Sequence, residues 1–193
     1  MRSHFAARLS AYCRACGFTL VELMTTIAVA AILLMIAVPS FQHLILSNRL
    51  TTTANALVDA INTARMDAIK LNATTQFCGS TTATNNTDTL GAACGTAAGA
   101  VYSLPLGAGS AGQVRATPPG ISSPVQIASA GVSGARFSGQ GWGYDPNGDS
   151  NTPLNQNTFA VICTSQLSSD NLRVISITAG SIVATASSTG ACP

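Results

Sequence analysis

Hydrophobic and polar positions divide this chain into three stretches. Residues 23–48 hold no charged side chain, and this apolar run is long enough for a helix that crosses a bilayer. Residues 50–71 repeat apolar side chains at steps of three and four, which predicts an amphipathic helix with one stripe packed on a sheet. The predicted stripe consists of Leu50, Ala54, Leu57, Ile61, Ala64, Ala68 and Leu71.

From residue 73 onward the pattern predicts strands and turns without a second helix. The predicted strands are runs rich in β-branched, aromatic or aliphatic residues, and they cover 74–78, 101–104, 125–128, 135–138, 158–163, 172–177 and 181–184. Residues 80–89 and 97–112 are low in hydrophobes and are predicted surface loops. A stretch of this size can bury one core against the helix but does not suffice for two domains.

One carboxylate, Glu22, lies near the start of the membrane-length helix. A charged side chain is costly in lipid, and by default it marks a functional residue with a partner. The junction of Gly17 with Phe18 just before it is typical of a processing site. Three arginines and no acid precede this junction, so the amino terminus is expected in the cytoplasm and the bulk of the chain is expected to be exported.

The charge balance bears on whether the chain binds nucleic acid. The chain has nine Lys and Arg against seven Asp and Glu, but three of the arginines precede Gly17. Without that segment the chain is close to neutral, so its basic isoelectric point does not indicate a nucleic-acid surface.

Of the six cysteines, two precede Gly17 and four follow it. Cys13 and Cys16 lie in the segment expected to be removed, where a metal site would need further ligands. Cys78, Cys94, Cys163 and Cys192 form an even set in a compartment that permits disulfides. Three pairings are possible. We favour Cys78 with Cys94, which closes a polar loop, and Cys163 with Cys192, which ties the carboxy terminus to a strand.

Other candidate chemistry is weak. Oxygen side chains alternate at Asp145, Asn147, Asp149 and Asn151, a pattern that can wrap calcium, but a bidentate Glu is missing and the same residues suit a tight turn. We therefore expect no cofactor. After processing the only histidine is His43, inside the apolar helix, so we expect no enzyme. Trp142 and Tyr144 are interpreted as packing or loop-tip residues in preference to a binding platform.

Residues 17–24 read GFTLVELM, which closely resembles the class III signal of type IV prepilins and type II secretion pseudopilins. The resemblance implies that a membrane peptidase cuts between Gly17 and Phe18 and that Phe18 is N-methylated. It also implies that Glu22 pairs with the methylated amino terminus of a neighbouring subunit. Pro39 resembles the pilin proline that kinks or loosens the helix.

Residues 64–72 read ARMDAIKLN and are similar to a stretch of the GspH/FimT group of minor pilins and pseudopilins, with Asp67 in place of the usual Glu. The order of the carboxy-terminal strands follows the same group. The implied fold is α+β, a long amino-terminal helix packed on an antiparallel β-domain. The implied organisation is a leader at 1–17, a transmembrane or filament-core helix at 18–48, an amphipathic helix at 49–72 and a β-rich domain at 73–193.

This resemblance implies a minor pilin that contributes to assembly and priming of a type IV pilus, with a place near the tip. Its expected partners are other minor and major pilins, the prepilin peptidase and the inner-membrane assembly platform. The expected location is the inner membrane, with the carboxy-terminal domain in the periplasm, and then the filament. A type II secretion pseudopilin is the alternative in the same structural class.

A DNA receptor for natural transformation is a functionally different alternative. FimT-like receptors are thought to carry a basic Gly-Arg-x-Arg motif, whereas the matching stretch here begins at Gly180 and holds no arginine. Arg136 and Arg173 are the weak DNA candidates. Since phosphate binding needs several cations on one face, we expect no specific DNA binding.

Overall fold

The structure is a computed structural model and describes residues 17–193. The predicted leader, except for Gly17, lies outside the described residues, as do Cys13 and Cys16. By its internal contacts the chain divides into a first unit that ends at Phe41 and a second unit, Gln42–Pro193.

A single helix, α1 (Leu20–Leu71), supplies the described helical part of the first unit and continues into the second. Its start is capped by Thr19, whose side-chain oxygen accepts a hydrogen bond from the backbone N–H of Glu22 at 3.2 Å. Its end is closed by Asn72, which adopts a positive φ of 44°. The backbone N–H of Ala73 then donates to the carbonyl of Ala68 at 3.0 Å. This is the hydrogen bond of a Schellman-type cap, and Asn tolerates the left-handed conformation it needs.

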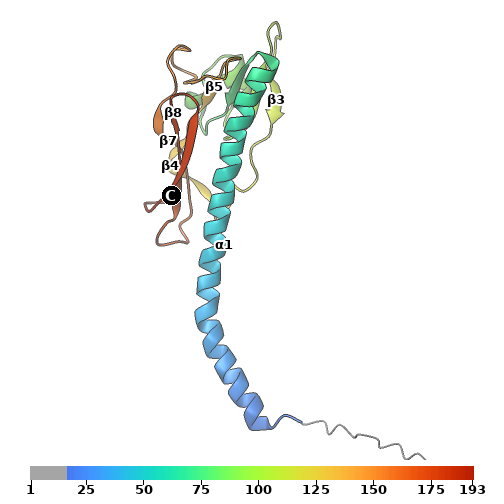
Figure 1. The fold of residues 1–193 in the computed structure, drawn as a ribbon, viewed down its shortest axis with the longest axis vertical. Coiled ribbons are helices and arrows are strands. Elements are labelled where there is room, and N and C mark those ends of the chain that lie inside the picture. The colour runs from blue at the N-terminus through green and yellow to red at the C-terminus, as the bar shows by residue number, and fades with distance from the viewer. Residues whose placement is uncertain (1–16) are drawn as a thin grey trace, which may run out of the picture. The chain divides into compact units, whose positions relative to one another are not determined.

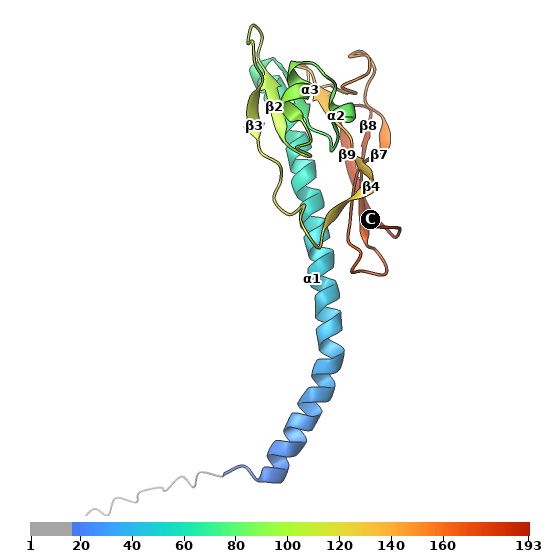
Figure 2. The ribbon, with the colours of Figure 1, turned by 180° about the vertical axis from the view of Figure 1, so that it is seen from behind.

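The second unit holds two antiparallel sheets beside the last turns of α1 (Figures 1 and 2). The first sheet has the order β3-β2-β1-β5-β6, and the second has the order β4-β7-β8-β9. The strands of the two sheets are β1 (Thr74–Phe77), β2 (Val101–Leu104), β3 (Gly112–Arg115), β4 (Gln126–Val132), β5 (Ala135–Phe137), β6 (Gly143–Tyr144), β7 (Gln156–Cys163), β8 (Leu172–Thr178) and β9 (Ile182–Ser188). The fold class predicted from the sequence is confirmed.

The core of the second unit lies between α1 and both sheets. Six of the seven predicted stripe residues are buried, from Leu50 to Ala68, and the small side chain of Ala60 is buried beside them. They form one cluster with Phe77 of β1 and Phe159 of β7, whose ring centroids lie 5.5 Å apart. The seventh residue, Leu71, is 51% exposed, so its placement on the buried stripe is wrong. The helix ends there, and the chain turns away through Asn72.

The prediction that no second helix follows residue 73 is also wrong. Two short helices follow, α2 (Thr82–Asn85), which lies within the predicted surface loop 80–89, and α3 (Thr89–Cys94), which begins at its last residue. Thr81 and Asp88 cap their starts, and each side chain accepts a backbone N–H three residues ahead. Both helices are too short for an apolar periodicity to show. The short strands β3 and β6 were missed as well.

Candidate assembly site

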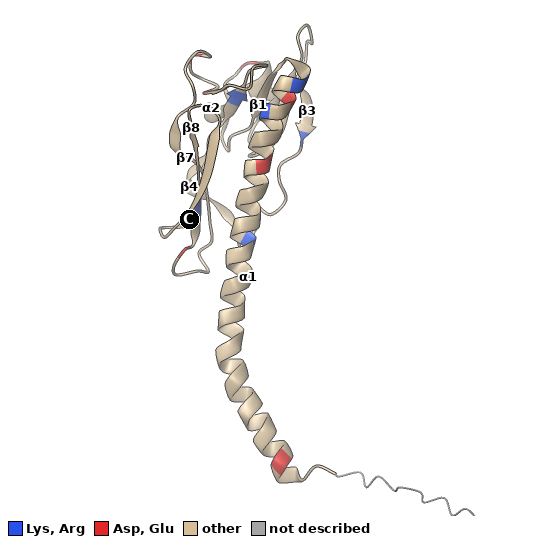
Figure 3. Ribbon diagram, in the orientation of Figure 1, with Lys and Arg blue, Asp and Glu red and all other residues tan. Residues whose placement is uncertain are grey.

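The first unit presents an apolar surface with almost no charge. Its large hydrophobic side chains are exposed throughout, and the exposed fraction ranges from 49% at Val38 to 80% at Met35. Figure 3 shows how sparse charged residues are along the first half of α1, where Glu22 is the only one before Arg49. Helix α1 is long and apolar enough, by length and composition, to cross a membrane. Burial of this surface therefore requires lipid or other protein chains.

The predicted processing site lies immediately before α1. Gly17 and Phe18 are exposed and precede the first helical residue, and a side-chain carbon at Gly17 would meet nothing within 4 Å. The peptide bond between them is therefore not enclosed by secondary structure. A protease needs an extended, accessible segment of this kind, so the geometry is compatible with cleavage at this bond.

Glu22 lies in the first turn of α1 and is exposed. Its backbone N–H is used by the Thr19 cap, whereas no hydrogen bond of its carboxylate is found among residues 17–193. The carboxylate is thus free to bind a group from outside the chain. Pro39 lies inside the same helix, where it removes one backbone hydrogen bond without ending the helix.

Two disulfides stabilise the second unit. Cys78 is bonded to Cys94, with their Cα atoms 5.4 Å apart, and Cys163 is bonded to Cys192, with their Cα atoms 5.7 Å apart. These are the two pairs that the sequence analysis favoured. The first encloses α2 and most of α3, and the second ties the end of the chain to β7. In the chain-entropy model each contributes about 3 kcal/mol.

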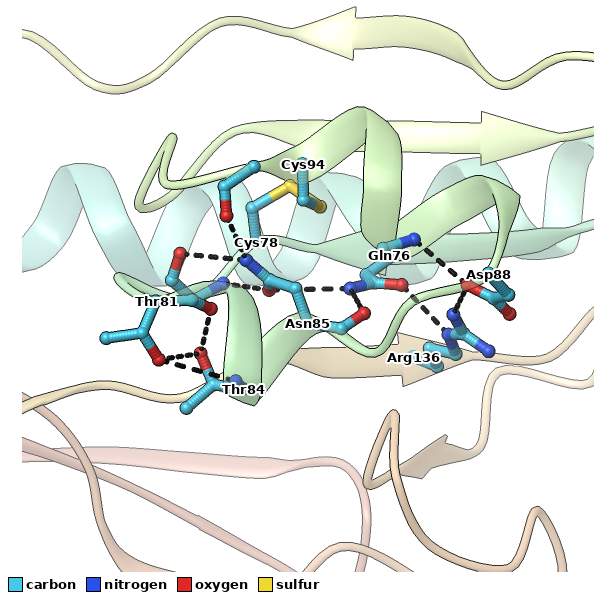
Figure 4. Close-up of a disulfide and its surroundings, with 11 residues drawn as sticks. Gln76, Cys78, Thr81, Thr84, Asn85, Asp88, Cys94 and Arg136 are labelled. Atoms are coloured by element: carbon cyan, nitrogen blue, oxygen red, sulfur yellow. Dashed lines mark hydrogen bonds and ion pairs between the residues drawn. A yellow bond between two sulfur atoms is a disulfide. The ribbon is translucent and has the colours of Figure 1, made fainter.

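Sequence reasoning missed a buried polar network inside the first disulfide loop (Figure 4). Its centre is Asn85, which is fully buried. The Asn85 Oδ1 atom accepts from the Gly79 N–H at 2.6 Å, and Nδ2 donates to the carbonyls of Gly79 and Gly95 at 3.2 and 3.0 Å. The Gln76 side chain donates to the Asn85 carbonyl at 2.8 Å. Asn85 thereby joins strand β1, helix α2 and the residue after α3.

The same network continues to an ion pair. Arg136 Nε donates to Gln76 Oε1 at 2.9 Å, and its terminal nitrogen Nη2 pairs with Asp88. Burial raises the pKa of Asp88, but the hydrogen bonds from Arg136 and from the Gly91 N–H, together with the attraction of the guanidinium, outweigh burial. The pKa of Asp88 therefore lies below its ordinary value of 3.8. The capping pattern of Asp88 before α3 was the signal that sequence reasoning overlooked.

The two weak DNA candidates both face inward. Arg136 is 8% exposed in the network above, and Arg173 is 6% exposed. Arg173 donates to the hydroxyls of Thr51 and Ser47 on α1, at 3.3 and 3.0 Å. The third arginine of residues 73–193, Arg115, pairs with Asp59 at 2.6 Å. Each guanidinium thus makes bonds within the chain and is not held free for phosphate.

The candidate calcium loop forms local turns. Asp145 accepts from the N–H of Asn147 at 2.8 Å, and Asp149 accepts from the N–H of Asn151 at 3.0 Å. The Asn147 amide donates to the carbonyl of Ala83 at 2.9 Å. Within residues 17–193 no group of three or more His, Cys, Asp or Glu is placed to hold a metal ion.

Residues 13–38 match the family model of the prokaryotic N-terminal methylation motif. This match and the exposed apolar helix define a membrane-anchored protein of the type IV pilin class, whose amino terminus carries a prepilin processing signal. Residues 53–181 match the family model of the type II transport protein GspH. Because this match covers more than half of the chain, the chain belongs to the GspH family of pilin-like proteins.

Searches among curated proteins and among solved structures found no match. The resemblance read from the sequence is confirmed at the level of the family. Members of these families are structural and not enzymatic. Membership implies processing by a prepilin peptidase and assembly with other pilins.

Proposed function

We propose that this chain is a minor pilin of a type IV pilus, which contributes to assembly and primes the filament from a position near its tip. The observation that carries the proposal is the first unit, an exposed apolar helix with one unpaired carboxylate near its start. A separately packed β-domain that is nearly neutral in charge follows it. This combination suits a subunit that leaves the membrane by burying its helix among other helices.

In this proposal the peptidase cuts between Gly17 and Phe18 and methylates the new amino terminus. The protein first sits in the inner membrane with its β-domain in the periplasm. Glu22 then binds the positive amino terminus of a neighbouring subunit. An unpaired charge costs several kcal/mol in an apolar environment, so the pair forms at only one axial offset and fixes the register of the two helices.

The match to the GspH model supports a second candidate, a pseudopilin of a type II secretion machine. Both candidates use the same helix and the same carboxylate. They differ in the filament that the subunit joins, a surface pilus or a secretion pseudopilus, and therefore in whether the cell loses pili or secretion without the subunit. A deletion strain that loses surface pili but secretes normally supports the first candidate, and the converse supports the second.

DNA capture is disfavoured by the geometry. The β-domain carries three arginines against four aspartates, and all three arginines bind groups within the chain. A face of several free cations, which phosphate binding needs, is not formed by the described residues of this domain.

The decisive experiment removes and relocates the carboxylate. Glu22→Gln is expected to be processed normally, as mass spectrometry of the methylated amino terminus will show, yet to be lost from sheared filaments. Glu22→Asp keeps the charge and is expected to retain part of the incorporation. A double change, Glu22→Leu with Leu23→Glu, moves the carboxylate about 100° around the helix at constant composition. This matched control is expected to fail like Glu22→Gln.

Filament incorporation of Glu22→Gln at the normal level would refute the register role. Incorporation of the double variant at the normal level would show that a charge anywhere in the first turn is enough. A processing control, Gly17→Val, is expected to keep the leader and to abolish incorporation.

A further inference from the structure

The turn between β5 and β6 and the loop between β6 and β7 together line an open hollow of about 410 Å³. Its side chains are Ser138, Gln140, Trp142, Ser150, Asn151 and Pro153. The volume falls in the range of small-molecule sites. One aromatic ring, two amides and two hydroxyls surround it, and no lining residue is charged.

The aromatic ring is presented outward by a fixed turn. Trp142, the only tryptophan of the chain, is 52% exposed. The Ser138 N–H donates to the Trp142 carbonyl at 3.0 Å, and the Gly141 N–H donates back to the Ser138 carbonyl at 2.8 Å. A turn that closes on itself in this way fixes the backbone that carries the indole before any ligand arrives, which lowers the entropy cost of binding.

Close packing leaves this turn little room to move. Gly141 has a φ of +80°, and a Cβ there would lie 2.8 Å from the Ile69 Cδ1 atom of α1. A Cβ at Gly143 would lie 2.4 Å from the Gly180 carbonyl oxygen. Glycine is therefore required at both positions, and the turn is seated against α1 on one side and the β8–β9 turn on the other.

A second observation points to a ligand. The Ser138 hydroxyl oxygen is buried at the edge of the hollow and has no hydrogen-bond partner among residues 17–193. Buried hydroxyls are nearly always paired, and each exception calls for an explanation. A rotation of the Ser138 side chain about its Cα–Cβ bond would turn this hydroxyl into the hollow that the residue lines, where a hydroxyl-bearing ligand would supply both a donor and an acceptor.

We propose that this hollow binds a neutral saccharide, with one sugar ring stacked on Trp142. A pyranose ring has an apolar face of C–H groups that matches the area of a single indole. Its rim of hydroxyls needs donors and acceptors, which the amides of Gln140 and Asn151 and the hydroxyl of Ser138 provide. This site is independent of whether the filament is a pilus or a pseudopilus.

Charge and shape argue against two other ligand classes. The neighbouring acid Asp149 lies beside Ser150, and Arg65 lies behind the turn at Gly141 without lining the hollow. An acidic sugar would therefore find no cation among the residues that line the hollow. Proline-rich peptides bind grooves formed between several aromatic side chains, whereas this hollow has one.

The test uses the full chain in a zwitterionic amine-oxide detergent, since maltoside and glucoside detergents would compete for the site. Because Trp142 is the only tryptophan, its fluorescence reports this site alone. Cellobiose, lactose, maltotriose and diacetylchitobiose are titrated separately. At least one is expected to change the emission saturably, with a Kd of about 0.1 to 1 mM, as suits a small and open site. Sialyllactose, digalacturonate and a proline-rich peptide are titrated in parallel.

Two variants separate binding from folding. Trp142→Ala, followed by saturation-transfer NMR, is expected to weaken binding at least about tenfold through the loss of stacking. Ser138→Ala keeps the fluorescent reporter and is expected to weaken binding about threefold to tenfold. Ser188→Ala on the exposed strand β9 is the matched control and is expected to bind as the unchanged chain does.

The proposal is overturned if no neutral sugar changes the emission up to about 10 mM, a concentration that would reveal even a weak site. It is also overturned if Trp142→Ala binds as tightly as the unchanged chain. Binding of only the acidic sugars, or of only the peptide, would assign the hollow to a different ligand class and reject this one.

Discussion

Asn85→Ala is the substitution from which we expect a large loss of stability for a small change in volume. The side chain is fully buried and makes close hydrogen bonds to three backbone groups, the N–H and carbonyl of Gly79 and the carbonyl of Gly95. Alanine makes none of them. The β1–α2 and α3–β2 connections would then be joined by the Cys78–Cys94 disulfide without the hydrogen bonds of Asn85.

The expected magnitude follows from these three groups. The buried Gly79 N–H loses its only acceptor, which costs about 2 kcal/mol, and each of the two carbonyls loses a donor at about 1 kcal/mol. The sum of about 4 kcal/mol is a large part of the 5–15 kcal/mol that holds a typical domain together. With a urea dependence of about 2 kcal/mol per molar, the unfolding midpoint is expected to fall by about 2 M.

Urea titration of the full chain, followed by the fluorescence of Trp142, measures this midpoint in the β-domain. Asn62→Ala, at an exposed position of α1, is the matched control and is expected to shift the midpoint by less than about 0.3 M. A fall of less than about 0.5 M for Asn85→Ala would refute the reasoning, since the three backbone groups would then have found other partners.

Asn85→Asp tests the same network through the pH dependence of stability. It keeps the oxygen that accepts from Gly79 but places a second oxygen against the two carbonyls. The buried carboxyl should have a folded-state pKa raised above its unfolded value, so the folded state binds the proton more tightly. This variant should therefore be more stable below the unfolded pKa and lose that stability as the pH rises through the folded one. A midpoint independent of pH between about 4 and 7, relative to the unchanged chain, would contradict this.

Two further predictions concern charge. Asp88→Asn keeps a good helix cap but leaves the Arg136 guanidinium, whose side chain is 10% exposed, without a carboxylate, at a cost of about 1–2 kcal/mol in the urea titration. Because the folded pKa of Asp88 is lowered, its contribution is present above the unfolded pKa and is lost as the pH falls through the folded one. The unchanged chain should thus lose more stability than Asp88→Asn below about pH 4, and parallel pH profiles would argue against the pair. Calcium is expected to leave the melting temperature nearly unchanged, and a rise of several degrees abolished by Asp149→Ala would instead establish a site.

The sequence predicted the elements whose periodicity extends over several residues. The apolar stripe of α1 was placed correctly from Leu50 to Ala68 because the packing interface repeats with the helix itself. The main strands of the second sheet, β7 and β8, were found because their apolar residues run continuously or alternate. The apolar repeat includes Leu71, but the helix ends at this residue and the side chain is exposed. The turn at Asn72 that ends the helix has no periodicity, so the repeat could not predict it.

The Asn85 network could not be predicted in the same way. Its members come from positions far apart in the chain, and the Arg136 bond to Gln76 spans 60 residues. Residues 80–89 lie mostly at the surface, as predicted, and Asn85 is the one buried residue among them. A buried Asn between polar neighbours has the same local sequence as an exposed one, so its burial could not be predicted. Only the capping residue Asp88 carried a local signal, which predicts a helix start but not the ion pair.

The arginines show how a domain with so few charges is held together. Each one adds a polar link between elements: Arg115 links β3 to α1, Arg136 links β5 to β1 and α3, and Arg173 links β8 to α1. A guanidinium has five donors in a rigid plane, so one such side chain can satisfy several groups at once.

Because its cations are used internally, the β-domain presents mainly neutral polar side chains to its surroundings. Contacts of this surface with neighbours would then depend on shape and hydrogen bonds, and they would change little with salt. The proposed pairing of Glu22 is the opposite case, a single charge in an apolar segment where screening is weak. In the proposed filament, register would therefore be set by the helix, and the β-domain could vary its exposed loops, including the Trp142 turn, without disturbing assembly.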